Sequence, residues 1–177
     1  MDFAAEFKRV LECFDETGID VAVVGGWALA IHGVVRATVD IDLLIRPEQA
    51  ELACDAATAL GFAIHNPAMS LHDGAIVIKR LVRPQPDWND GVLVLDLMFV
   101  TEALASVWGG RQLVESTVGR VPVVSLDGLT TLKKISGRPQ DLADLEALAN
   151  LASQASRDTE QTRANQPSRK ADEGYSR

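Results

Sequence analysis

Residues 23–45 read VVGGWALAIHGVVRATVDIDLLI, and this stretch decides the fold. A short β-branched run ends in Gly25–Gly26, a compact apolar segment follows, and an alternating run then places Asp40 and Asp42 two residues apart. Side chains alternate across a strand, so both carboxylates lie on one face, about 6–7 Å apart along the strand. The residues between and beside them are apolar and point to the opposite face, toward a core.

The two aspartates and the two glycines suggest chemistry on phosphate. Carboxylates that share a face raise each other's pKa unless a cation lies between them, and Mg²⁺ suits that position because it prefers oxygen ligands. Gly25–Gly26 allows backbone N–H groups to approach a phosphate at the positive end of a helix. No Gly-Lys-Ser/Thr follows, so the segment is not a P-loop. The simpler interpretations are a solvated edge strand for the aspartates and a plain turn for the glycines.

The rest of the chain predicts a mixture of helices and short strands. We expect helices over 5–17, 27–32, 48–60, 101–108, 125–135 and 138–151, and strands over 20–24, 38–45, 62–65, 75–82, 92–100 and 121–124. They interleave without a regular βαβ repeat, so we expect an α+β or irregular α/β fold rather than a doubly wound sheet. Residues 1–152 form the expected domain. Residues 153–177 are polar and poor in large apolar side chains, which predicts a disordered tail.

Composition limits the classes of function. The chain has 177 residues, 47% of them hydrophobic, and a formal net charge of −8. This acidic balance argues against extended nucleic-acid binding, which needs clustered Lys and Arg, but it is compatible with a small substrate or a metal-bridged phosphate. Cys13 and Cys54 lack CxxC spacing, so we expect a reducing cytoplasm rather than a disulfide framework or a zinc cluster. The sequence shows no signal peptide and no apolar run of membrane-spanning length.

The string GGWALAIHGVVRATVDIDLLI resembles the motifs GG-x-A, HG, R-x-T and D-x-D of the DNA polymerase β-like nucleotidyltransferase superfamily. It is most similar to the bacterial AbiEii-type and aminoglycoside-type members, and the resemblance covers about residues 20–150. The resemblance implies a minimal nucleotidyltransferase fold of the α+β class, with a short mixed β-sheet flanked by helices. That family uses a third carboxylate on a later strand, which Asp96 in VLVLDLMFV matches. The closing TLKKISGRPQDLADLEAL resembles a helix that supplies a basic residue, followed by a helix with R-x-x-D-x-x-D.

The resemblance implies transfer of a nucleoside monophosphate from an NTP to an acceptor hydroxyl. Two Mg²⁺ ions, with Mn²⁺ as an alternative, would be held by Asp40, Asp42 and Asp96. The same three residues are therefore the predicted catalytic and metal-binding set.

Other residues are implied to face the triphosphate. Gly25 and Gly26 would approach it through backbone N–H groups. Arg36 and either Lys133 or Lys134 would neutralise its charge. The choice between the two lysines is open, and so is the simpler interpretation that both lie at a solvated helix end.

The acceptor also stays open: a small hydroxylated compound, a protein side chain or an RNA end. The resemblance extends to toxins of toxin–antitoxin systems, so an antitoxin partner is among the expectations. The alternative is a catalytically inactive nucleotidyltransferase fold that serves as a binding or interaction module. The three carboxylates argue against that alternative, because an inactive copy has no physical reason to keep clustered negative charge.

Overall fold

The computed structural model describes residues 2–85 and 91–164. The strands are β1 (Val21–Val23), β2 (Asp40–Ile45), β3 (Ala63–Ile64), β4 (Met69–Leu71), β5 (Ile76–Gln85), β6 (Gly91–Phe99), β7 (Gln112–Ser116) and β8 (Gly119–Val123). The helices are α1 (Phe3–Glu16), α2 (Gly25–Ile31), α3 (Ala50–Ala59), α4 (Ala105–Gly109), α5 (Leu126–Ser136) and α6 (Pro139–Ala164). Single 3₁₀ turns at Pro47–Gln49 and Glu102–Leu104 precede α3 and α4.

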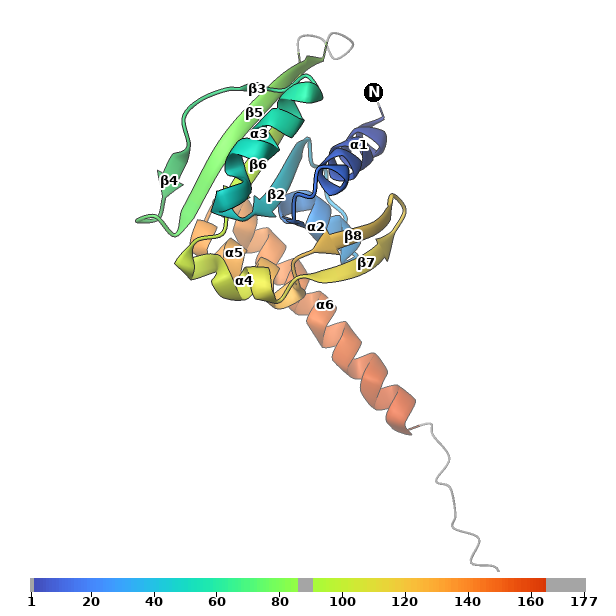
Figure 1. Ribbon diagram of the computed structural model, residues 1–177. Coiled ribbons are helices and arrows are strands. Elements are labelled where there is room, and N and C mark those ends of the chain that lie inside the picture. Colours follow the sequence, from blue (N-terminus) through green and yellow to red (C-terminus); the bar gives the residue numbers. More distant parts are fainter. Residues whose placement is uncertain (1, 86–90, 165–177) are drawn as a thin grey trace, which may run out of the picture.

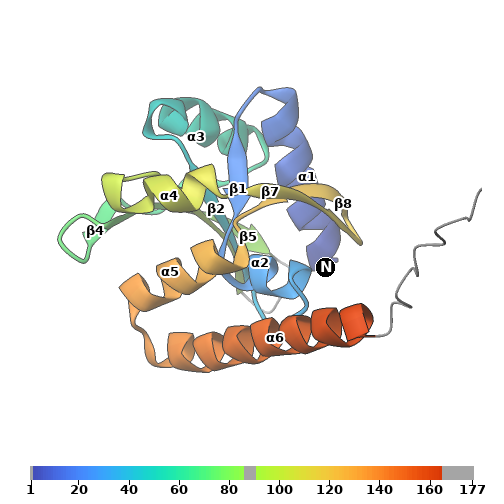
Figure 2. The same cartoon turned by 90° about the horizontal axis from the view of Figure 1, so that it is seen from below.

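Within the described residues, eight strands form one mixed sheet (Figure 1). Its order is β3-β5-β6-β2-β1-β8-β7, and β4 pairs with β5. The pairs β2–β6 and β1–β8 are parallel, whereas the other pairs are antiparallel. Helices α1 and α3 lie on one side of the sheet, and α5 and α6 lie on the other (Figure 2). This arrangement confirms the expected mixed sheet flanked by helices.

Strands β4 and β7 are absent from the sequence-based expectation. Their sequences, MSL and QLVES, are short, and most of their residues are exposed. A strand of this kind has little apolar alternation to detect, and it forms because a neighbouring strand supplies hydrogen bonds. Pairing of β4 with β5 and of β7 with β8 provides those bonds.

The central strands β2 and β6 have one apolar face and one polar face. They pair in parallel, so that Ile41 lies beside Leu95, Leu43 beside Leu97, and Asp42 beside Asp96. The four apolar side chains are fully buried. Because side chains alternate along both strands, the aspartates share the opposite face, on the side of α5 and α6. Core burial on one face thus fixes the carboxylates on the other.

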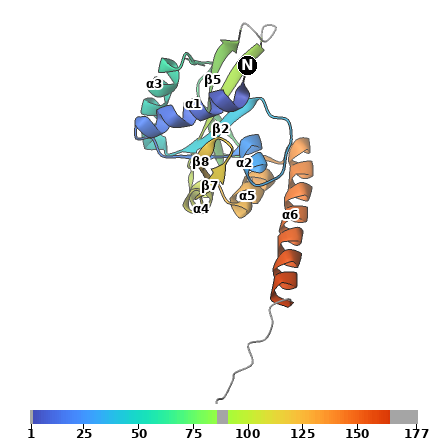
Figure 3. The same cartoon turned by 90° about the vertical axis from the view of Figure 1, so that its right-hand side faces the viewer.

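Helix α6 continues past residue 152, where the sequence predicts the tail to begin. It has 26 residues, and its C-terminal half extends away from the body of the protein (Figures 1 and 3). Leu148 is the last buried residue of α6 whose side chain the structure describes. A helix anchored at one end propagates readily through Ala, Gln and Arg, even without burial. Residues 165–177 of the predicted disordered tail lie outside the described residues.

Among residues 2–85 and 91–164, no helix combines the length and apolar content needed to cross a lipid bilayer.

Deleting residues 153–177 should change the melting temperature by less than about 2 °C, because changes away from a core alter stability by about 0.5 kcal/mol or less. Differential scanning fluorimetry of the full and shortened chains tests this. As a control, a deletion that begins at residue 147 also removes the buried Leu148 and should lower the melting temperature further. A large drop in melting temperature on deletion of residues 153–177 would contradict this prediction and show that the distal part of α6 packs against the body.

Candidate active site

A cavity of about 470 Å³ opens on the polar face of the sheet. Its walls come from β2, β5 and β6, from the loop before β2, and from the turn between α5 and α6. Nearly all of the residues that the sequence predicts for the site line this cavity. They are Gly25, Arg36, Asp40, Asp42, Asp96 and Lys133. Gly26 lies behind the cavity wall instead, buried against Thr38.

The three predicted carboxylates converge on adjacent strands. Asp42 of β2 and Asp96 of β6 are register partners, and neighbouring strands lie about 4.8 Å apart. Asp40 lies two residues before Asp42 on the same face. The expected convergence of these side chains is therefore confirmed, while their roles stay predictions.

Burial and nearby negative charge both raise the pKa of the β2 aspartates. Burial is the larger cause for Asp42, and together with the charges of Asp96 and Asp40 it raises the pKa of that carboxyl to about 6. Burial, together with the charge of Asp96, also raises the pKa of Asp40. Both carboxylates are thus less stable in their charged form here than they are in water.

Arg80 of β5 holds the third carboxylate. Its Nε donates to Oδ1 of Asp96 at 2.8 Å and its Nη2 donates to Oδ2 at 2.6 Å, which makes a bidentate pair. Asp96 is only 5% exposed, and a carboxylate so buried needs a partner of this kind. The hydrogen bond with Asp96 raises the pKa of Arg80 further above its usual value.

The sequence interpretation missed Arg80. A signal was present, because IVIKRLV is an apolar run interrupted by cations, just as VLVLDLMFV is an apolar run interrupted by one acid. The register of the two strands determines which charges meet, because Arg80 pairs directly with Asp96 in the antiparallel β5–β6 ladder. Register between distant strands is not readable from either run alone.

The glycine pair lets β2 and its preceding loop come close to α2. Gly25 has φ +64°, and a Cβ there would overlap the carboxylate of Asp42, lying 2.6 Å from its Cγ. A Cβ on Gly26 would lie 2.6 Å from Cβ of Thr38. Any side chain at either position would displace a neighbour. The pair is thus required for packing, and its predicted contact with a triphosphate stays a prediction.

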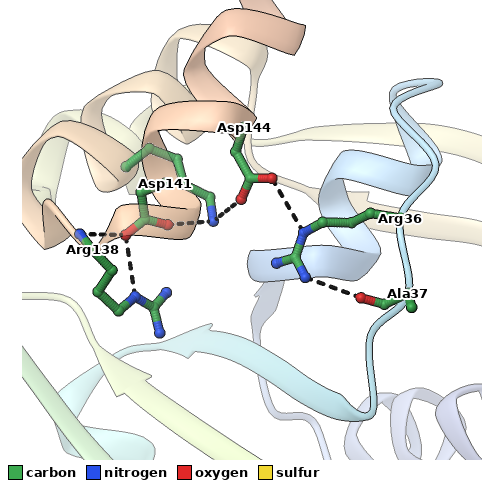
Figure 4. A network of polar contacts seen from close by, with 6 residues as sticks. Arg36, Ala37, Arg138, Asp141 and Asp144 are labelled. Atoms are coloured by element: carbon green, nitrogen blue, oxygen red, sulfur yellow. Dashed lines mark hydrogen bonds and ion pairs between the residues drawn. The ribbon is translucent and has the colours of Figure 1, made fainter.

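Lys133 is a buried member of an ionic network (Figure 4). It is 4% exposed, and its Nζ donates to Oδ1 of Asp141 at 2.8 Å and lies 2.6 Å from Oδ2 of Asp144. Arg36 joins the network through an ion pair of 3.3 Å between its Nε and Oδ1 of Asp144. Lys134 is exposed. Of the two lysines left open by the sequence, Lys133 is the one that faces the cavity.

The turn between α5 and α6 explains the spacing of the motif GRPQD. Gly137 adopts a left-handed conformation with φ +59°, which ends α5, and Pro139 begins α6. Asp141 accepts hydrogen bonds at 3.1 Å from both the backbone N and the Nε of Arg138. Burial alone would raise the pKa of Asp141, but hydrogen bonds from Lys133, Arg138 and Ser136 lower it below its usual value.

The oxygen atoms around the cavity fit Mg²⁺ in part. Among the described residues, no group of three or more His, Cys, Asp or Glu side chains is arranged to hold a metal ion, and Arg80 engages both oxygens of Asp96. The described residues place five carboxylates and four cations in or beside the cavity: Asp40, Asp42, Asp96, Asp141 and Asp144, with Arg36, Arg80, Lys133 and Arg138. The ion pairs within this set involve Asp96, Asp141 and Asp144, which leaves the hard oxygen atoms of Asp40 and Asp42 as the ones that suit Mg²⁺.

Comparisons with known proteins bear on the fold. No protein-family model matches the chain, and no curated protein matches it in sequence. Its structure is similar to TM1012 from Thermotoga maritima, a proposed nucleotidyltransferase, with a TM-score of 0.59 and 15% identity over 82% of this chain and 91% of that one. ANT(2'')-Ia, solved with adenylyl-2''-tobramycin, has a TM-score of 0.59 and 18% identity over 91% of this chain and 94% of its own.

The lincosamide antibiotic adenylyltransferase LnuA, solved with lincomycin, has a TM-score of 0.56 and 16% identity, over 83% of this chain and 96% of that one. At such identities the similarity establishes the fold and nothing finer. The chain therefore has a nucleotidyltransferase fold, as the sequence resemblance implies. Its assignment to the AbiEii-type group stays a prediction.

Asp42→Asn should stabilise the metal-free protein at neutral pH. The Asp42 carboxyl has a pKa of about 6 when folded against an ordinary value of 3.8, so its ionisation favours the unfolded chain. This cost begins near pH 4, grows until about pH 6 and is constant above it, at roughly 3 kcal/mol. Urea unfolding in EDTA at several pH values measures the difference between variant and wild type.

The matched control is Asp15→Asn, on the exposed surface of α1. Its stability difference from wild type should stay flat across the same pH range. Parallel curves for Asp42→Asn and wild type would contradict the raised pKa.

Proposed function

We propose that this chain is a Mg²⁺-dependent nucleotidyltransferase that moves a nucleoside monophosphate from an NTP to an acceptor hydroxyl. The observation that supports this most is the placement of Asp40, Asp42 and Asp96 on adjacent parallel strands, lining one cavity. The nucleotidyltransferase fold of the chain agrees with it.

Asp40 and Asp42 would hold Mg²⁺, and Asp96 would serve as the third ligand. When bound, Mg²⁺ would supply Lewis-acid stabilisation of the charge on the reacting phosphoryl group. Use of Asp96 as a ligand requires Arg80 to share or release one of the carboxylate oxygens that it now engages. Arg80 meanwhile fixes the direction of Asp96 toward the cavity, where that carboxylate would also be placed to orient the acceptor hydroxyl.

The cationic side of the cavity would take the triphosphate. Arg36 and Lys133, predicted for this role, line it together with Arg138. Gly25 lines the cavity beside Asp42, so it is the member of the glycine pair that would approach the phosphates.

The opposite side of the cavity supports a small acceptor. Five apolar side chains share the sheet face beside Asp96; they are Met69, Leu71, Ile76, Ile78 and Met98. A cavity of about 470 Å³ is within the range of small-molecule sites. The net charge of −8 argues against an extended RNA acceptor. We therefore favour a small hydroxylated compound with an apolar face over a protein side chain or an RNA end.

Two other parts of the predicted function rest on the sequence alone. A role as the toxin of a toxin–antitoxin pair, with an antitoxin partner, stays a prediction, and so does the cytoplasmic location. The second candidate function is a catalytically inactive binding module. The pairing of Arg80 with Asp96 favours it to the extent that the carboxylate is already neutralised without metal.

Incubation with Mg²⁺ and each α-³²P-labelled NTP, against a panel of small hydroxylated compounds, proteins and RNAs, tests the proposal. We expect label transfer by wild type and none by Asp40→Ala, because that variant lacks a predicted metal ligand. Mg²⁺ with NTP should also raise the melting temperature of wild type by mass action, and Asp40→Asn should remove that increase.

Asp20→Ala, a change at an exposed carboxylate before β1, is the control and should behave as wild type. Label transfer that survives in Asp40→Ala would contradict the assigned site. Wild type that transfers no label, and is not stabilised by any NTP with Mg²⁺, would favour the inactive module.

A further inference from the structure

Arg138 lies in the turn between α5 and α6, at the mouth of the cavity. We propose that Arg138 is the main protein ligand of the NTP phosphates, and that Lys133 is a buried partner of the acidic pair that holds Arg138 in place. The proposal rests on the proposed function, because it needs a triphosphate in the cavity. It differs from the sequence expectation, which gave this charge to Arg36 and Lys133.

Arg138 is accessible to a ligand and close to the carboxylates. Its side chain is 70% exposed, it lines the cavity, and Figure 4 shows its guanidinium extending away from α6 toward the strands. Arg138 lines the same cavity as Asp40 and Asp42, so its guanidinium shares that space with the proposed metal ligands. A phosphate that is bound by Mg²⁺ at those aspartates would lie within reach of this side chain.

The guanidinium is held at one end. Asp141 accepts from the backbone N and from Nε of Arg138, both at 3.1 Å. Among the described residues this is the ion pair that Arg138 makes, and it uses Nε, so the two terminal nitrogens point onward from the anchor. A guanidinium fixed through Nε presents two parallel N–H donors, which is the geometry that binds phosphate oxygens in pairs.

Lys133 is buried and paired with two carboxylates, unlike the exposed Arg138. Its Nζ lies 2.8 Å from Asp141 and 2.6 Å from Asp144, and both carboxylates are almost completely buried. To bind a phosphate, Lys133 would have to leave two buried carboxylates without their closest cation, which is strongly unfavourable. Its contact with Asp141 instead keeps that carboxylate in position to anchor Arg138.

Arg36 is also committed within the network. Its Nε pairs with Asp144, and its Nη1 donates to the carbonyl of Ala37 at 3.1 Å. Its side chain is 25% exposed, against 70% for Arg138. Arg138 is therefore the cation of this wall that can present its terminal nitrogens to a ligand while it keeps its ion pair with Asp141.

Binding measurements distinguish the role proposed for Arg138 from the one proposed for Lys133. Isothermal titration with Mg²⁺ and a non-hydrolysable α,β-methylene NTP, using the base that binds wild type most tightly, gives the dissociation constant for each variant. Arg138→Ala should weaken binding by roughly ten- to a hundredfold, as expected for loss of a charge-assisted contact, with a melting temperature within about 2 °C of wild type. Arg138→Lys should recover part of the affinity only, because it lacks the paired donors.

Lys134→Ala is the matched control, since Lys134 is exposed on α5 next to Lys133, and it should leave the dissociation constant unchanged. Lys133→Gln should lower the melting temperature by roughly 5–15 °C, because it removes the buried cation that contacts both Asp141 and Asp144. A further titration with the matching nucleoside monophosphate should show a smaller effect of Arg138→Ala than the triphosphate does.

Wild-type affinity in Arg138→Ala, with wild type itself binding the NTP, would overturn this inference and leave the proposed function intact. A Lys133→Gln variant that keeps its melting temperature yet loses the NTP would also overturn it. Absence of NTP binding by wild type would overturn both the inference and the proposed function.

Discussion

The carboxylates of Asp40, Asp42 and Asp96 are held close together despite their mutual repulsion, and the rest of the cavity is arranged around them. The carboxylates share one face of two adjacent strands because their apolar neighbours must fill the core on the other face. Moving one aspartate to the other face would need a shift of register that also moves the apolar residues out of the core. Core packing therefore holds the three carboxylates together despite the free-energy cost of their repulsion. The surrounding cations reduce that cost, and the bidentate contact from Arg80 to Asp96 is the most direct of them.

The corner between α5 and α6 is a second centre of charge, and it is balanced differently. Lys133 and its two aspartates are buried and satisfy one another, so they fix how α5 and α6 meet rather than offering charge to a ligand. A buried ion pair contributes little net stability, but breaking it is costly, and this makes the corner rigid. Arg138 projects from that rigid corner into the cavity.

The cavity consequently has two unlike sides. One side carries the cations of α5, of the turn and of the loop before β2, whereas the other is an apolar surface on β4, β5 and β6. The carboxylates lie on the sheet face that both sides share. Such a division suits a reaction that joins a highly charged donor to an acceptor of lower charge, and it directs the two reactants to opposite sides of the same carboxylates.

Local patterns in the sequence predict the strand that carries Asp40 and Asp42 on one face, and the glycine pair before it. These features depend on local alternation and local backbone freedom, which a short run of residues contains in full. The packing of distant segments brings Arg80 of β5 beside Asp96, and it buries Lys133 between Asp141 and Asp144. Those outcomes depend on register and on helix docking between segments far apart in the chain, where no local pattern specifies which charges will meet.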